Sequence, residues 1–224
     1  KETNIDDKYI LGPDKFPLME NKLGQLPPLI DKLFENNIVE KLNKSRIPNK
    51  NSAFIRKGVD KDDNKSFINA IAKVANITVE KLMRKIITNL SPLLFIKLNN
   101  GELVKHFGTD EERLNDKYNI FKKWCQTYPD FISYLEADIL TSIDFSTIDE
   151  YITNTKNNTE DISKIIRVIR VFYAFEYYKK YLADDNIQKD FNHLWNLFSE
   201  KNLWLFKTGM NILIIEKEDS NGDE

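Results

Sequence analysis

The spacing of the apolar residues limits the possible folds more than any other feature of this sequence. Large apolar side chains recur at three- and four-residue intervals between 162 and 182, and the same spacing fills 66–75 and the stretch after Thr78. This spacing gathers apolar side chains on one face of an α-helix. The same reasoning predicts further helices that begin near Pro28, at Thr109 within a capping box, at Pro129 and near Asn186.

Strand signals are few. Residues 210–216, which read MNILIIE after Gly209, are short, β-branched and bounded by charge, and they predict a buried strand. Residues 53–59 form a second short apolar run. Since a strand needs a partner, we expect 210–216 to pair with 53–59 or with sheet supplied beyond residue 224. The fold class predicted is α+β and predominantly helical, with few short strands, the clearest at 210–216.

The predicted domain organisation has three parts. Residues 1–25 read as an extended N-terminal arm, residues 26–217 as a single mainly helical α+β domain, and residues 218–224 as a solvated tail. The chain has 224 residues, of which 41% are hydrophobic, so it can bury a substantial core.

Charge and cysteine content narrow the functional classes. The 33 Lys and Arg against 35 Asp and Glu give a net charge of −2, whereas nucleic-acid binders usually carry a basic excess. A single cysteine, Cys125, excludes an intrachain disulfide and fits a reducing compartment. No apolar run is long enough to span a membrane, and the N-terminus lacks a signal-peptide pattern. We therefore expect no membrane association and an intracellular, reducing location.

The residues that usually carry metal or cofactor chemistry are sparse. The two histidines, His106 and His193, do not form a zinc-binding spacing, and no Gly-rich phosphate loop is present. We predict no metal and no cofactor, and we interpret Cys125 as a small buried hydrophobic residue.

One stretch combines aromatic and basic side chains. Residues 172–178 are aromatic on more than one face, and basic residues flank them. Core packing explains part of this pattern, and a protein-binding face explains the rest. The interaction residues predicted are Arg167, Arg170, Tyr173, Tyr177 and Lys180. An alternative is a nucleic-acid-binding module that uses the face of Arg167, Arg170, Lys179 and Lys180.

Residues 63–71, DNKSFINAI, resemble the nucleophile motif of the ovarian-tumour-type (OTU) cysteine proteases. The family motif has Asp, Gly, Asn or Asp, and the nucleophilic Cys before Leu-Phe-Arg-Ala-Ile. Asp63 falls on the family's Asp, Ser66 on the Cys, and Ala70 with Ile71 on the Ala-Ile pair. A nucleophile at a helix N-terminus gains from the helix dipole and from nearby backbone amides. The order of a helix at 190–198 and a strand at 211–215 is also similar to the later part of that fold.

Among the positions at which this chain departs from the family motif, Ser66 replaces Cys and Asn64 replaces Gly. The resemblance therefore implies a related scaffold with a dead site or an engineered Cys-to-Ser replacement. The enzymatic alternative is an OTU-like deubiquitinase with catalytic Ser66 and Asp63, and with His193 or a residue beyond 224 as the base. The alternative from the residues alone is that Ser66 only begins a helix.

A second resemblance covers more of the chain. It rests on LGQLPP at 23–28, on FIRKGV at 54–59 leading into SFINAI at 66–71, and on LFKTGMNILIIE at 205–216. These segments look like a large conserved protein of giant DNA viruses, associated with the virion or with early transcription. That resemblance implies that Ser66 is natural, and it implies no catalytic residue. We therefore predict a non-catalytic structural or interaction domain of a giant-virus protein on a degenerate OTU-like scaffold, whose partners are virion proteins or ubiquitin. The resemblance also implies a location in the virion or the host cytoplasm.

Overall fold

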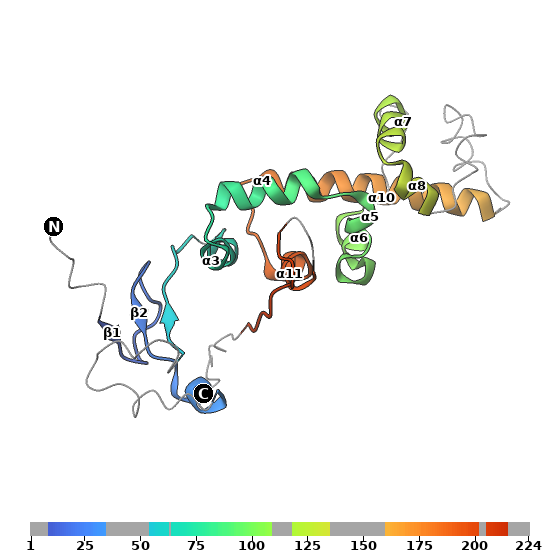
Figure 1. Ribbon diagram of the computed structural model, residues 1–224. Coiled ribbons are helices and arrows are strands. Elements are labelled where there is room, and N and C mark those ends of the chain that lie inside the picture. Colours follow the sequence, from blue (N-terminus) through green and yellow to red (C-terminus); the bar gives the residue numbers. More distant parts are fainter. Residues whose placement is uncertain are drawn as a thin grey trace, which may run out of the picture. The chain divides into compact units, whose positions relative to one another are not determined.

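The computed structural model describes residues 9–34, 54–62, 64–108, 118–134, 160–201 and 205–214. These residues are mainly helical and include a three-stranded sheet, so the predicted α+β class is confirmed (Figure 1). The chain divides into two compact units, Lys1–Val79 and Glu80–Glu224. The predicted division into an arm, one domain over 26–217 and a tail stays a prediction.

The first unit contains the sheet, built from β1 (Ile10–Leu11), β2 (Leu23–Gly24) and β3 (Arg56–Lys57). β2 is central, parallel to β1 and antiparallel to β3. Ile10 is buried, and Leu23 and Ile55 pack against it. Two of the strands thus come from the stretch predicted as an extended arm.

Arg56 ties the sheet to the preceding turns. Its Nε–H donates to the Gln25 carbonyl at 2.6 Å, and its terminal nitrogen donates to the Gly12 and Pro13 carbonyls at 3.3 and 3.4 Å. Such short strands bury little apolar area, so charge-assisted hydrogen bonds of this kind supply much of the local order.

Two helices of the first unit begin where the sequence predicts. α1 (Pro28–Leu33) starts with proline at its first position, where the missing N–H is not needed. α3 (Ser66–Ala75) ends at Asn76, whose left-handed backbone closes the last turn. Both predicted starts are confirmed.

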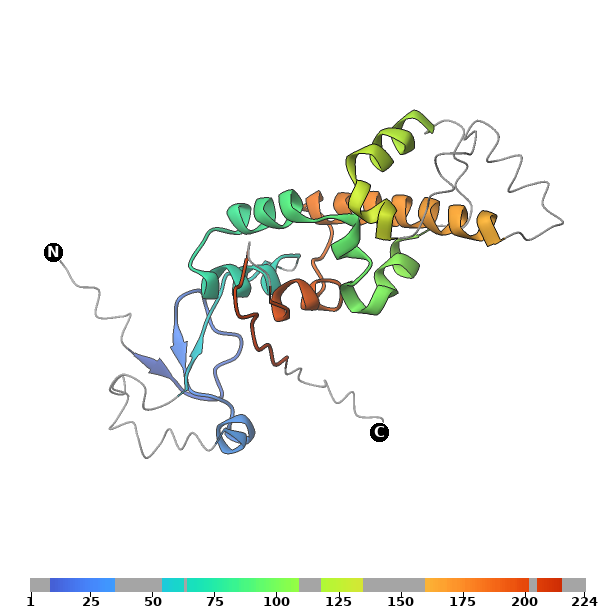
Figure 2. The ribbon, with the colours of Figure 1, turned by 45° about the vertical axis from the view of Figure 1, so that its right-hand side comes forward.

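The second unit is helical. Its longer helices are α4 (Val79–Asn89, whose first residue closes the first unit), α7 (Tyr118–Thr127), α10 (Glu160–Ala183) and α11 (Phe191–Ser199). Its short elements are α5 (Pro92–Phe95), η2 (Leu98–Gly101), α6 (Glu102–Phe107) and α8 (Pro129–Tyr134). α10 contacts α5, α6 and α7, and the turned view in Figure 2 shows α6 and α8 beside it.

Aromatic side chains form the core of the second unit around α10. The Phe172 ring lies 5.2 Å from that of Phe121 and 5.4 Å from that of Trp124, measured between centroids. The Phe95 ring contacts Phe175 at 5.8 Å and Tyr178 at 5.2 Å. Edge-to-face and tilted contacts of this kind add to the burial of apolar area. Among the described residues, no helix is long and apolar enough to cross a membrane.

The strand predicted at 210–216 is not formed over 210–214, which have no regular secondary structure, and 215 and 216 lie outside the described residues. Its expected partner, the run at 53–59, instead supplies β3 to β2. Residues 210–214 do have the apolar composition of a strand, but a strand forms only where the edge of another strand is free to pair with it. α11 begins at Phe191, later than predicted, because Asp190 accepts the Asn192 amide and caps the helix there. The capping box at Thr109 lies outside the described residues.

Candidate functional site

A groove of about 550 Å³ lies beside α10 in the second unit. Aliphatic side chains line its floor, namely Ile96, Val104, Ile166 and Val171. Basic side chains, one tyrosine and one glycine complete the lining, namely Lys105, Arg167, Arg170, Tyr134 and Gly101. Figures 1 and 2 both show the helices that carry these residues, α6, α8 and α10, next to one another.

Helical periodicity explains the contribution of α10. Ile166 and Arg170 are four residues apart, as are Arg167 and Val171, so the four side chains share one face of the helix. Val171 is buried, whereas Arg167 and Arg170 are exposed. The same face therefore presents an apolar edge toward the core and two guanidinium groups toward solvent.

A left-handed turn directs α6 toward the groove. Asn99, Asn100 and Gly101 have φ values of 47°, 53° and 84°, and α6 begins at the next residue. Asn and Gly are the residues that adopt this conformation most readily. The turn places Val104 and Lys105, which α6 carries, in the lining of the groove.

The stem of Arg170 lies against the end of α6. A Cβ atom added at Gly108 would lie 3.2 Å from Cγ of Arg170. The absence of a side chain at Gly108 thus allows the aliphatic part of Arg170 to pack there.

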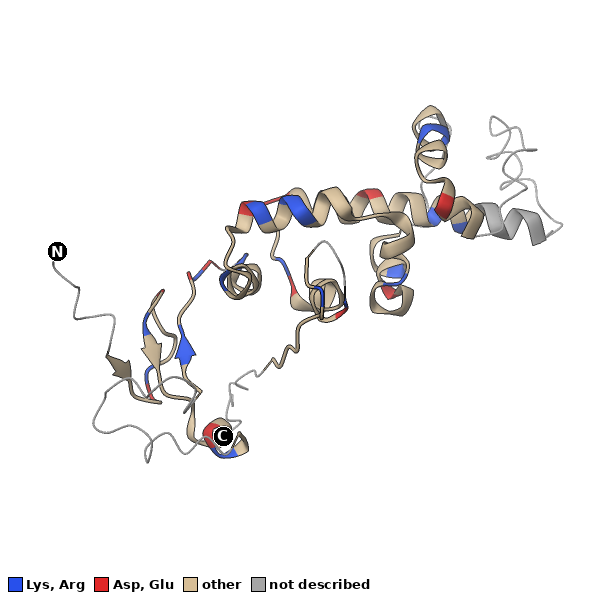
Figure 3. Ribbon diagram, in the orientation of Figure 1, with Lys and Arg blue, Asp and Glu red and all other residues tan. Residues whose placement is uncertain are grey.

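Among the residues that the structure describes, three basic side chains and no acidic one line the groove. Lys105 pairs with Glu102 at 2.7 Å on the exposed side of α6. Arg167 and Arg170 add two further charges, and Figure 3 shows basic positions of α10 next to α8. This local excess contrasts with the net charge of −2 for the whole chain.

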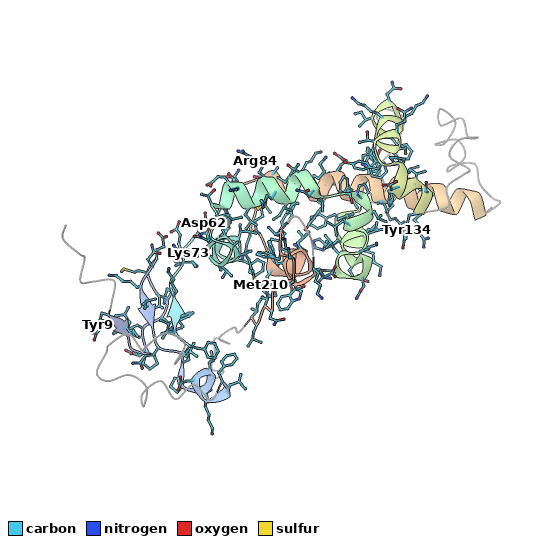
Figure 4. The ribbon with its side chains drawn as sticks, in the orientation of Figure 1. Tyr9, Asp62, Lys73, Arg84, Tyr134 and Met210 are labelled. Atoms are coloured by element: carbon cyan, nitrogen blue, oxygen red, sulfur yellow. The ribbon has the colours of Figure 1, made fainter. Side chains whose placement is uncertain are left out.

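Tyr134 forms one side of the groove and is 57% exposed. Nζ of Lys97 lies 5.9 Å from the centroid of its ring, within the range of a cation–π contact. Figure 4 labels Tyr134 beside α10. One face of this ring is therefore already in contact with a cation.

The structure separates the five predicted interaction residues into three groups. Arg167 and Arg170 line the groove. Tyr177 and Lys180 contact each other, with the ammonium 5.1 Å from the ring centroid. Tyr173 is only 3% exposed and contacts Phe172 in the core. Tyr173 is thus a packing residue, whereas the other four residues are at least partly exposed.

Ser66 is exposed at the first position of α3. Its hydroxyl donates a hydrogen bond of 2.5 Å to the carbonyl oxygen of Asp62. This contact satisfies the hydroxyl locally at the start of a helix. Ser66 belongs to the first unit and His193 to the second. Asp63 lies outside the described residues, so the catalytic assignment of these three residues stays a prediction.

The two histidines meet in the second unit, although they are far apart in the sequence. Their ring centroids are 4.4 Å apart, and the His193 ring also contacts Phe107 at 5.3 Å and Tyr181 at 5.5 Å. The turn before α11 fixes this arrangement, since the Asp190 amide donates to the Tyr181 hydroxyl at 2.9 Å. No sequence motif predicts that His106 and His193 lie next to each other.

Burial lowers the pKa of His193, the positive charge of His106 lowers it further, and Asp190 opposes both. Nδ1 of His193 is buried without a hydrogen-bond partner among the described residues. The pair therefore favours the neutral form of His193.

Neither the thiol of Cys125 nor the potential metal ligands among the described residues form a second candidate site. Cys125 is half-buried, and burial raises the pKa of its thiol to about 12, which suppresses the nucleophilic thiolate. Within the described ranges, no group of three or more His, Cys, Asp or Glu side chains gathers at one point.

Sequence reasoning found the two arginines of the groove and missed the rest of its lining. The missed residues are Ile96, Gly101, Val104, Lys105, Tyr134, Ile166 and Val171. The sequence feature that could have indicated this part of the groove is Asn-Asn-Gly at 99–101, because these residues are typical of a sharp turn. Nothing in the sequence indicated that α6 and α8 would lie beside the same face of α10.

No family model matches the chain, and no solved structure matches it. The chain is similar to the uncharacterized protein R327 of Acanthamoeba polyphaga mimivirus, with 26% identity over 236 residues. The match covers 98% of this chain but 13% of that protein, so the chain spans about an eighth of its relative's length. The chain thus resembles one segment of a large giant-virus protein.

Proposed function

We propose that this chain is a non-catalytic interaction domain of a giant-virus protein, acting in the virion or in early gene expression. The groove beside α10 carries the proposal, because it combines an aliphatic floor with three basic side chains at its rim. A concave apolar surface with a few polar groups is the usual form of a binding site. The similarity to a mimivirus protein supports the viral setting.

The geometry of Ser66 supports the non-catalytic part of the proposal. A serine nucleophile needs a base that accepts its proton, and the Ser66 hydroxyl donates to a backbone carbonyl, which cannot act as that base. The degenerate OTU-like scaffold remains our interpretation of residues 63–71.

Affinity capture tests the interaction role. The chain serves as bait in lysate from amoebae infected with the mimivirus, beside the variant Arg167→Glu/Arg170→Glu. Lys122→Glu/Lys123→Glu is the matched control, because it makes the same change of charge at two exposed residues of α7 outside the groove. We expect viral proteins to be retained by the wild type and the control and lost by the groove variant.

Two other outcomes would contradict this assignment. Equal capture by all three proteins would remove the groove as the interaction site. Loss of capture in a Lys179→Glu/Lys180→Glu variant alone would move the site to the Tyr177–Lys180 contact. Separately, release of a fluorophore from a ubiquitin conjugate by the wild type or by Ser66→Cys would favour the hydrolase alternative.

A further inference from the structure

We propose that the histidine pair, His106 and His193, makes the packing of α11 acid-sensitive, so that α11 separates from α6 at mildly acidic pH while the rest of the second unit stays folded. This inference does not depend on the groove and goes beyond the proposed function. Three features carry it: the two rings lie close together, one ring nitrogen is buried, and α11 is a short helix.

The two imidazole rings are too close for both to carry a positive charge without repulsion. Their centroids are 4.4 Å apart, with an angle of 41° between the ring planes. His106 is exposed on α6 and can exchange protons with solvent, whereas His193 is only partly exposed. Imidazoles take up protons in the mildly acidic range, and like charges at this separation repel each other. Protonation of both rings therefore favours their separation.

The second feature is the environment of Nδ1 of His193. This atom is buried and has no hydrogen-bond partner among the described residues. The neutral ring can place a lone pair there, but the imidazolium carries an N–H group at both nitrogens. A charged donor that is buried without an acceptor costs more than an unpartnered neutral nitrogen. The charged ring of His193 is therefore stable only where it reaches water.

Other titratable groups surround His193. Asp190, which caps α11, attracts the imidazolium and opposes the other effects. Tyr178 and Tyr181 approach from α10, and burial raises the pKa of both hydroxyls, that of Tyr181 to about 12, so both stay neutral in acid. Nζ of Lys189 lies 4.9 Å from the ring centroid of Tyr181 and adds positive charge nearby. Since the pKa of His193 is lowered, burial and His106 outweigh Asp190.

The charges of α6 act through His106. Glu102 precedes His106 by one helical turn, and its carboxylate pairs with Lys105 at 2.7 Å. A carboxylate at this spacing favours a proton on His106, and a charged His106 disfavours one on His193. The third neighbouring element, η2, has the sequence Leu-Asn-Asn-Gly and no titratable side chain.

α11 is the element that the charged pair releases most easily. It has 9 residues, and helices of this length are marginal without tertiary contacts. α6 packs against both α10 and η2, whereas the main contact of α11 is with η2. The Tyr178 hydroxyl donates to the His193 carbonyl at 2.9 Å, and the Asn99 side-chain amide donates to the Asn192 carbonyl at 2.5 Å. Both bonds lie at His193 or the residue before it, so movement of the ring weakens them.

Release of α11 uncovers an apolar surface. Leu194, Leu197 and Phe198 are at most 2% exposed. Their spacing of three and four residues places them on one face of α11. In mildly acidic surroundings the second unit thus presents an apolar face that is covered at neutral pH.

Native-state amide exchange of the full chain, followed by NMR, tests this inference. The opening equilibrium constant of each amide is its exchange rate divided by the intrinsic rate of an unstructured peptide at the same pH. The amides compared are those of residues 194–198 in α11 and of residues 172–175 in the core of α10. Each set is measured at pH 7.5 and pH 5.5, with and without a low concentration of urea.

We expect the opening constant of residues 194–198 to exceed that of residues 172–175 at both pH values. It should rise by about threefold or more at pH 5.5, because the opened form binds protons more tightly. It should depend only weakly on urea, since a local opening exposes little surface.

Two variants connect this rise to the histidine pair. Glutamine stays neutral, so His193→Gln should remove the pH dependence of the α11 opening. His106→Gln should reduce it, because burial of His193 remains. His106 is exposed, so this second variant is informative even if His193→Gln does not fold. Far-UV circular dichroism verifies that each variant is folded.

Three results would overturn the inference. Equal opening constants in α11 and in the α10 core would mean that α11 opens only when the whole unit unfolds. An α11 opening constant that is the same at both pH values would remove the acid sensitivity. A rise that persists unchanged in the glutamine variants would assign the acid sensitivity to other groups. The proposed function is tested by capture at neutral pH and is unaffected by any of these results.

Discussion

His106 and His193 show how residues with no local motif acquire a shared environment on folding. Each lies among ordinary helical residues in the sequence, and their rings are 4.4 Å apart in the folded chain. Burial is the largest cause of the lowered pKa of His193, and the charge of the nearby His106 lowers it further. The free energy of unfolding must therefore depend on pH through this pair.

The sign of this dependence follows from the lowered pKa of His193. As pH falls below the ordinary value of 6.5, the unfolded chain takes up the proton before the folded chain does. The contribution of His193 to the free energy of unfolding is thus fully present above pH 6.5. It is lost progressively as the pH falls toward the lowered pKa of His193. Urea unfolding between pH 8 and pH 5 measures the change.

Two variants isolate this contribution. His193→Gln should reduce the loss of stability on acidification. His106→Gln should reduce it less, since burial of His193 remains its largest cause. Identical pH dependence for the wild type and His193→Gln would contradict the assignment.

Gly58 is a second residue whose role depends on close packing. A Cβ atom there would lie 1.9 Å from the Met19 carbonyl oxygen, too close for any side chain. Gly58→Ala should therefore destabilise the sheet by about 1–3 kcal/mol. Faster amide exchange at Asn21 and Gly58 checks this, because these amides take part in hydrogen bonds across the same contact.

Gly12→Ala is the matched control. The nearest atom to its added Cβ is Oδ1 of Asp14 at 2.6 Å, on an exposed side chain that can rotate away. Equal acceleration of exchange in both variants would show that the Met19 contact does not decide the effect.

At the scale of elements, the left-handed turn at the end of η2, directly before α6, determines one wall of the groove. Gly101 has a φ of 84°, which costs an L-residue energy. Gly101→Ala should lower the free energy of unfolding of the second unit by about 1–2 kcal/mol. Urea unfolding followed by tryptophan fluorescence measures this, since Trp124 and Trp195 lie in that unit.

Asn100→Gly is the control for this turn. Asn100 has a φ of 53°, and glycine adopts that conformation without strain. We expect a change within about 0.5 kcal/mol. A loss as large as that of Gly101→Ala would indicate that side-chain contacts, rather than backbone conformation, dominate the turn.

At the scale of the whole molecule, the division of the chain is testable. The aromatic core around α10 draws on residues 95–178, all within Glu80–Glu224. A fragment of residues 80–224 should therefore unfold cooperatively, with a near-ultraviolet circular dichroism spectrum that shows fixed aromatic packing. If only a fragment of residues 26–217 folds, the predicted single domain is correct instead.

The sequence by itself determined the helices, because apolar periodicity and capping are local properties. The starts of α1 and α3 could be placed from Pro28 and Ser66, and α10 from its apolar spacing. Local reasoning also found Arg167 and Arg170, since exposed charge next to aromatic residues is visible in the sequence.

Only the tertiary structure decided what depends on neighbours distant in the sequence. Residues 210–214 carry a strand pattern but form no strand, whereas 56–57 pair with β2. The groove and the histidine pair exist because α6 packs against α10 and lies next to the start of α11. Sequence spacing specifies which face of a helix is apolar, but packing of the whole core selects the helices that meet there.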